Sequence, residues 1–243
     1  MQTTRLLLRV TAALSAVALT ICGAYLASSR AEQNLMQTAG TTASRQVVIL
    51  DAGHGGADGG CSSANGDVEK GINLNILLDL RSLLQSAGYE VIVTRDTDVS
   101  IHDDGVEGLA NQKRSDMDNR LEIFNSVENA VCISIHQNQF TDPQYHGAQM
   151  FYADTNKKSA LLAQTLQDQF VAFLQPENRR EIKRCGTELF LCYYSENPTV
   201  MAECGFLSNP EEAALLTTED YQQKVAFTLF SGIICFQAAQ ARR

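Results

Sequence analysis

The sequence lacks the regular cysteine spacing of a disulfide framework, although its 243 residues include seven cysteines. Their number is odd, no two of them form a C-x-x-C pair, and a domain of this size does not need disulfides to bury a core. We therefore expect free, mostly buried thiols, with Cys185 and Cys192 as the one pair worth considering for a bridge. The absence of matched spacing also argues against a structural zinc site built from thiolates.

The sequence also lacks an excess of positive charge and any internal repeat. Its 19 Lys and Arg residues face 28 Asp and Glu residues, which gives a formal net charge of −9. Leaving out Arg5, Arg9 and Arg30 near the N-terminus takes this charge to −12. An acidic protein of this kind is unsuited to nucleic acid, so no nucleic-acid partner is expected. Without repeats or biased stretches, the chain predicts one folded domain of ordinary size.

One long apolar run is present, at the N-terminus. Residues Val10 to Ala27 follow Arg5 and Arg9, and no acidic residue precedes Glu32. Because the run approaches the ~20 residues that cross a bilayer, residues 1–31 are predicted to be a signal peptide or an N-terminal membrane anchor. With the basic end in the cytoplasm, the remaining chain is extracytoplasmic, secreted or anchored to the outer face of the cytoplasmic membrane. The polar stretch 32–45 predicts a linker, and residues 46–243 the folded domain.

From Gln46 onward, short β-branched runs alternate with longer amphipathic stretches, which is typical of an α/β domain. Predicted strands are Val47–Asp51, Glu90–Arg95, Ala130–His136, Ala148–Tyr152, Glu188–Cys192 and Thr199–Cys204. Predicted helices are Ile72–Ala87, Ser115–Val127, Lys157–Leu174 and Asp220–Gln240, with a surface loop at Val99–Gln112. This order predicts a twisted, largely parallel sheet with helices on both faces and functional groups at the carboxyl ends of the strands.

Three candidate metal ligands lie at ends of these elements. His54 stands in a glycine-rich loop after the first strand, Glu69 begins the first helix, and His136 ends another apolar strand. Singly, each has an ordinary explanation: a hydrogen-bonded loop histidine, or a carboxylate at the positive end of a helix dipole. Together, two histidines and one carboxylate with an open fourth position form the ligand set of catalytic zinc.

A second carboxylate, Glu203, lies near the end of the last predicted strand. A buried ionisable group is costly unless it is used or paired. Two interpretations remain open: a salt bridge to Arg95 or Arg120, or a general base whose pKa is raised by burial. Asp51 is a candidate to accept a hydrogen bond from a ligand histidine, at the ring nitrogen that does not bind the metal.

Five motifs in this order resemble those of the zinc-dependent N-acetylmuramoyl-L-alanine amidases, and they extend over residues 46–240. They are Asp51-Ala-Gly-His54-Gly-Gly, Asp58-Gly-Gly, Val68-Glu69-Lys70, Ser134-Ile-His136-x-Asn138 and Glu203-x-Gly205-Phe-Leu-Ser-Asn-Pro210. A lone domain behind an N-terminal hydrophobic segment, without wall-binding repeats, is similar to the spore-cortex, CwlD-like branch of that family.

The resemblance implies that His54, Glu69 and His136 bind Zn²⁺ and that Glu203 is the catalytic carboxylate. It also implies a six-stranded sheet related to that of zinc carboxypeptidases. The implied reaction is hydrolysis of the amide bond between N-acetylmuramic acid and L-alanine in peptidoglycan, in spore cortex maturation. Because some clostridial relatives are thought to depend on a lipoprotein, a lipoprotein or another activator is a candidate partner here.

Two other functions stay open from the sequence. A zinc peptidase acting within the stem peptide would need a fixed positive group for a terminal carboxylate, and no motif assigns one. A non-catalytic wall-binding protein would have kept only the fold. The basic cluster of Arg179, Arg180, Lys183 and Arg184 is either a solvated face or a site that meets a carboxylate of the peptide or an acidic partner.

Overall fold

A six-stranded sheet forms the centre of the protein, which is described by a computed structural model over residues 47–241. The predicted leader, 1–31, and linker, 32–45, lie outside the described residues. The strands are β1 (Val48–Ala52), β2 (Val91–Val93), β3 (Val131–Asn138), β4 (Gln149–Tyr152), β5 (Lys183–Arg184) and β6 (Thr199–Phe206), in the spatial order β2-β1-β3-β6-β4-β5. All neighbours are parallel except β4 and β6, so the predicted largely parallel sheet is confirmed.

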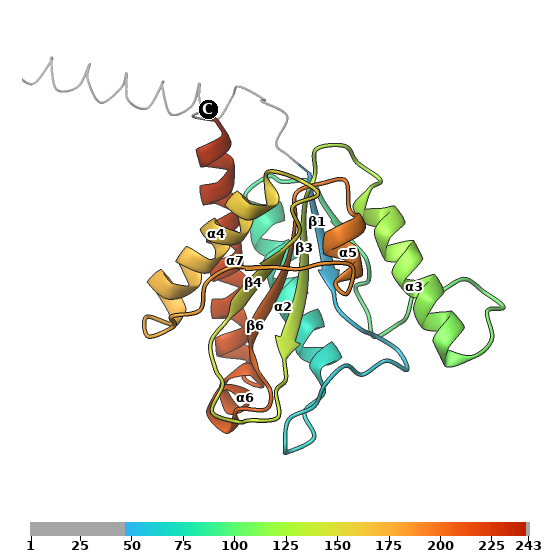
Figure 1. The fold of residues 1–243 in the computed structure, drawn as a ribbon, viewed down its shortest axis with the longest axis horizontal. Coiled ribbons are helices and arrows are strands. Elements are labelled where there is room, and N and C mark those ends of the chain that lie inside the picture. Colours follow the sequence, from blue (N-terminus) through green and yellow to red (C-terminus); the bar gives the residue numbers. More distant parts are fainter. Residues whose placement is uncertain (1–46, 242–243) are drawn as a thin grey trace, which may run out of the picture. The chain divides into compact units, whose positions relative to one another are not determined.

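Helices cover both faces of this sheet (Figure 1). They are α2 (Glu69–Ser86), α3 (Leu109–Phe124), α4 (Ser159–Gln169), α5 (Phe190–Tyr194), α6 (Pro210–Leu216) and α7 (Glu219–Ala241), and a π-helical turn, η1 (Phe170–Leu174), continues α4. Val48 and Leu50 of β1 belong to the core beneath α2, α4 and α7, whereas Ile49 belongs to a smaller core with Phe124 of α3 and Leu191 of α5. The strands are apolar throughout because both faces are covered.

Helix α7 is long and apolar enough to cross a membrane by length and composition, and it is the one such helix in the described part of the chain. Its residues Leu229, Ile233 and Phe236 are fully buried in the main core, where α7 packs against α2 and α4. This helix is therefore apolar because it is a core helix of the domain.

The predicted strand Glu188–Cys192 is wrong. The segment begins with a turn, in which Leu189 N donates to Gly186 O at 3.3 Å, and then forms helix α5. The fifth strand is instead the short β5, which pairs with β4. A short apolar run is ambiguous between a strand and a buried helical turn. Here the helical form brings the rings of Phe190 and Tyr194 into contact, with centroids 4.9 Å apart and planes tilted by 48°.

Helix α3 also differs from its prediction. It begins at Leu109, inside the predicted loop Val99–Gln112, and ends three residues before the predicted Val127. The loop before it is tied to the helix by Asp116, whose Oδ1 accepts hydrogen bonds from Ile101 N at 2.7 Å and Ser100 Oγ at 2.9 Å. The predicted loop is thus shorter and more ordered than its composition indicated.

The six cysteines in the described residues are all free, and three of them are buried. Cys185 and Cys192 lie beside each other, because Cys185 N donates to Tyr152 O at 2.9 Å and Cys192 Sγ to the adjacent Phe151 O at 3.9 Å. The pair considered from the sequence is therefore adjacent in space, and the structure has no disulfide between the two residues.

Candidate active site

The loop after β1 holds His54 in an unusual backbone conformation. Its φ angle is 65°, in the left-handed region that non-glycine residues seldom adopt. Arg120 Nη2 donates to His54 O at 2.7 Å, and the neighbouring Gly53 N donates to Ile135 O at 3.1 Å. A Cβ atom at Gly53 would lie 2.1 Å from Cε1 of His136. Glycine at this position therefore allows the two histidines to approach each other.

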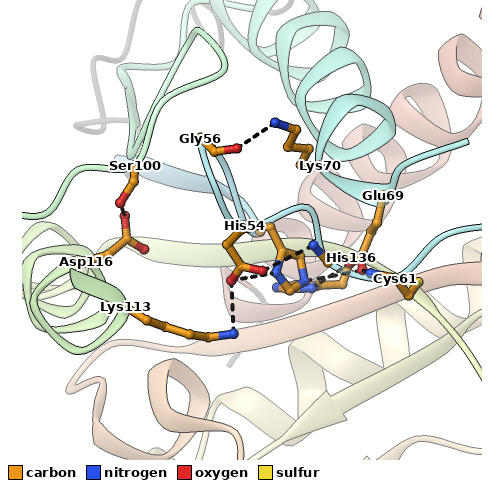
Figure 2. Close-up of polar contacts among 12 residues, drawn as sticks. His54, Gly56, Cys61, Glu69, Lys70, Ser100, Lys113, Asp116 and His136 are labelled. Atoms are coloured by element: carbon orange, nitrogen blue, oxygen red, sulfur yellow. Dashed lines mark hydrogen bonds and ion pairs between the residues drawn. The ribbon is translucent and has the colours of Figure 1, made fainter. Parts of the chain in front are cut away.

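His54, Glu69 and His136 converge on one point (Figure 2). His54 Nε2 lies 3.2 Å from Glu69 Oε2, and His136 Nδ1 lies 2.9 Å from Glu69 Oε1. The two imidazole rings are 4.9 Å apart and nearly perpendicular, at 78°. One potential ligand atom from each residue lies within 4.8 Å of the others. The structure thus brings the three sequence-predicted ligands together.

Glu69 is held as a charged group. It is 2% exposed, and its Oε2 accepts from Cys61 N at 2.9 Å, while Oε1 accepts from Gln137 N and Asn73 Nδ2, both at 3.1 Å. Burial opposes ionisation, but hydrogen bonds from the two histidines outweigh it and hold the pKa of Glu69 well below its usual range. The carboxylate is therefore both ionised and fixed in orientation before any metal binds.

The second nitrogen of His54 has its own carboxylate partner. Asp58 Oδ2 lies 3.1 Å from His54 Nδ1 and 3.0 Å from Lys113 Nζ. The Lys113 side chain reaches the site from α3 (Figure 2). Such a carboxylate–histidine pair typically orients a metal-binding imidazole. Asp51 was expected in this role, and that expectation is wrong: its oxygens bind Arg120, Thr94 and Ser134. Two imidazoles and one fixed carboxylate, with an orienting carboxylate behind, fit a zinc ion.

Glu203 lies next to this cluster in the sheet. It is in register with His136 across β3 and β6, so both side chains project from the same face. Burial and the negative charge of Glu69 raise the pKa of Glu203 to about 7, although the charge of His136 opposes the change. Its Oε2 atom is buried and has no hydrogen-bond partner in the described part of the protein. The side chain of Cys204, next in sequence, is buried in the core on the opposite face.

The salt bridge considered for Glu203 is not formed. Arg95 Nε donates to Ala52 O at 2.9 Å, and Arg120 pairs with Asp51 and Asp116. Both guanidinium groups instead stabilise the loop that carries His54. An open acceptor at Oε2 and a raised pKa match a group that exchanges protons.

Space for a ligand lies on the same side as α3 and α5. A cavity of about 260 Å³ is lined by His54, His136, Lys113, Phe190 and Met201, among others. A larger one of about 480 Å³ shares Asp58, Lys113 and Asp116 with it and extends beneath the loop at Val99. The candidate metal-ligand cluster therefore opens onto a cleft.

Comparison with known proteins decides the family. Residues 48–235 match the N-acetylmuramoyl-L-alanine amidase family. The chain belongs to this family. It is 34% identical over 191 residues to the germination-specific N-acetylmuramoyl-L-alanine amidase of Bacillus subtilis, covering 79% of each chain. It is 26% identical to the amidase AmiA of Escherichia coli, covering 79% of this chain and 76% of that relative.

Solved structures agree with this assignment. The CwlD amidase of Clostridioides difficile, solved in complex with the GerS lipoprotein, superposes with a TM-score of 0.77 at 36% identity, over 80% of this chain and 99% of that one. The catalytic domain of the amidase CwlV from Bacillus (Paenibacillus) polymyxa gives a TM-score of 0.65 at 26% identity, over 79% and 98%. The predicted family, its CwlD-like character and the predicted enzyme class are confirmed.

Proposed function

We propose that this amidase hydrolyses the bond between N-acetylmuramic acid and L-alanine with the help of zinc held by His54, Glu69 and His136. The observation that carries the proposal is the buried, unpartnered Oε2 of Glu203 on the same sheet face as His136. A carboxylate of this kind beside a two-histidine, one-carboxylate cluster is the arrangement of metal-assisted amide hydrolysis.

When bound, zinc supplies a Lewis acid that polarises the scissile carbonyl. Glu203 acts on protons: its Oε2 takes one from the attacking water and returns it to the amine of L-alanine as that group leaves. The burial of Glu203, which favours the protonated form, suits a carboxyl group that must hold a proton between the two steps. Asp58 keeps Nδ1 of His54 occupied, so that Nε2 faces the metal position.

The bond cleaved is identified by mass spectrometry of digested peptidoglycan. We expect intact stem peptides with a new L-alanine amino terminus and glycan strands with a free lactyl carboxyl group. Shortened stem peptides would instead support a zinc peptidase, and binding without any cleavage would support a non-catalytic wall protein. Zinc is tested by metal analysis of the purified protein, with His136→Ala as the variant that loses the ion.

The setting proposed is the spore cortex, outside the cytoplasmic membrane. The germination-specific relative in Bacillus subtilis supports the cortex, and residues 1–31 are proposed to export or anchor the domain, with 32–45 as its linker. Digestion of purified cortex and of vegetative wall compares the two substrates. N-terminal sequencing of the exported protein distinguishes a cleaved leader from a retained anchor.

A lipoprotein activator is proposed because the CwlD structure was solved with the GerS lipoprotein. We expect residues 46–243 alone to fold but to release stem peptides slowly from cortex with added zinc. Rapid release without a partner would contradict this requirement and leave the amidase function intact.

A further inference from the structure

A row of polar side chains crosses one face of the sheet, from the candidate metal centre towards the edge strand β5. His136 on β3 is in register with Glu203 on β6, and Glu203 is in register with Gln149 on β4. Residues directly opposite each other on neighbouring strands project from the same face. Arg180, just before β5, ends the row by donating from Nη2 to Gln149 Oε1 at 2.5 Å.

Arg180 is a half-buried cation whose hydrogen bonds are incomplete. Its Nε is buried and has no acceptor, and it forms no ion pair with any residue that the structure describes. Glu212 is an acidic neighbour, but its oxygens accept hydrogen bonds from Gly147 N at 2.9 Å and Phe206 N at 2.8 Å. By contrast, Arg120 pairs with two carboxylates. Nη1 of Arg180 donates no hydrogen bond to any described residue and, unlike Nε, is not a buried atom, so it is the donor that a ligand carboxylate can reach.

The guanidinium group is also held in place. Arg180 N donates to Asn178 Oδ1 at 2.9 Å, and Asn178 Nδ2 donates to Ala148 O at 2.8 Å, which ties the segment to β4. The guanidinium carbon lies 4.9 Å from the centre of the Phe206 ring, three residues beyond Glu203 on β6. A fixed donor loses little conformational entropy when a ligand binds.

We propose that Arg180 is a substrate-binding residue that receives a carboxylate of the stem peptide, on the side of Glu203 away from the metal centre. The planar donors of a guanidinium group suit a carboxylate. From His136 to Gln149 the row covers two strand spacings, about 10 Å. Since an extended residue spans about 3.5 Å, the carboxylate belongs to one of the first two or three residues of the stem. This inference rests on the proposed amidase function.

The test is a kinetic comparison of two muropeptides that differ only in whether the stem carboxylate nearest the scissile bond is free or amidated. On the free carboxylate, Arg180→Gln should raise KM about 10- to 100-fold, the scale of a charge-assisted hydrogen bond, and Arg180→Lys should recover part of the loss. On the amidated substrate, the KM of the wild-type enzyme should rise by a similar factor relative to the free carboxylate. Arg180→Gln should then raise KM little further. Arg179→Gln, at an exposed neighbour paired with Glu177, should match wild type on both.

Two results would overturn the inference. One is an equal loss by Arg180→Gln on both substrates. The other is a loss confined to kcat with a shifted pH profile, since Arg180 would then act on the charge of Glu203. Wild-type discrimination between the two muropeptides is a second measure that does not depend on whether a variant folds. If cleavage occurs within the stem, the amidase proposal fails. Calorimetric binding of both muropeptides to Glu203→Gln, with and without Arg180→Gln, then still tests Arg180.

Discussion

Asp58 and His54 form a carboxylate–imidazole pair, 3.1 Å from Oδ2 to Nδ1, which fixes the imidazole nitrogen that faces Glu69. Against partial burial, hydrogen bonds from Lys113 and His54 hold the pKa of Asp58 at about 2, so the carboxylate is ionised at neutral pH. The pair gives the candidate metal site an orienting group that comes from the same glycine-rich loop as His54.

Asp58→Ala is expected to weaken zinc binding about 10- to 100-fold, because the imidazole loses its orienting partner. The zinc affinity of Asp58→Asn should lie between those of wild type and Asp58→Ala, since its amide oxygen still accepts a hydrogen bond from Nδ1 of His54. Competition with a chromogenic chelator measures the affinity. Glu177→Ala, which removes an 88% exposed carboxylate paired with Arg179, serves as the control and should leave zinc affinity unchanged. Unchanged zinc affinity in Asp58→Ala would show that the pair is incidental.

Glu203→Gln is expected to keep zinc and fold but to lose turnover by about 10²-fold or more, since the amide preserves shape and removes the proton carrier. Stem-peptide release from peptidoglycan measures the rate, and metal analysis checks the site. A variant with nearly full activity would make Glu203 a structural residue.

The same substitution should change the pH dependence of stability in the metal-free protein. The folded pKa of Glu203, about 7, lies above its ordinary value of 4.5, so the folded state holds the proton more tightly. The favourable contribution of this proton to the free energy of unfolding is complete below about pH 4.5 and is lost as pH rises towards 7. Relative to wild type, Glu203→Gln should therefore gain up to about 3 kcal/mol in the free energy of unfolding between those values. Urea unfolding of both proteins at about pH 4.5 and about pH 8 measures this gain. An equal difference in unfolding free energy between variant and wild type at both pH values would contradict the raised pKa.

Asp51 and Arg120 form a buried ion pair whose loss should strongly lower the free energy of unfolding. Arg120 is 1% exposed and also donates to the carbonyl oxygens of Ala52 and His54. Asp51→Ala leaves this cation with Asp116 as its remaining carboxylate partner, so we expect a loss of about 3 kcal/mol in unfolding free energy and weaker zinc binding. Denaturant unfolding measures the loss, and Glu177→Ala, in an exposed pair, should cost less than about 1 kcal/mol.

The sequence contains enough information for the positions of the metal-ligand residues but not for their surroundings. His54 and His136 stand out because each follows an apolar strand, and parallel strands bring their carboxyl ends to one edge. Asp51 looked like the partner of a histidine because it lies close in sequence. However, the left-handed turn at His54 directs that imidazole towards Asp58, while Asp51 faces Arg120. A strand pattern does not reveal such a reversal of backbone direction.

Other features depend on contacts between distant segments. The position of Arg180 near Glu203 follows from the antiparallel register of β4 with β6, which no local pattern encodes. Helix α3 begins in a polar stretch with no apolar period, and its first residue, Leu109, is 73% exposed. A hydrogen bond from Gln112 Nε2 to Val106 O, at 2.9 Å, ties this first turn to the preceding loop, and a hydrophobic pattern does not reveal such a contact. Helix α6 was missed although its signal was present, since Asn209 before Pro210 caps the helix by accepting from two backbone amides.

The residues of the catalytic centre come from four separate ends of strands and helices, between residues 54 and 203. No continuous stretch of the chain carries the metal-binding set, and its geometry exists only once β1, β3 and α2 have assembled. If the chain is exported in extended form, as proposed, it therefore crosses the membrane without an assembled metal-binding site. Under that proposal, the ion would be acquired from the metals available in the compartment where the exported domain folds.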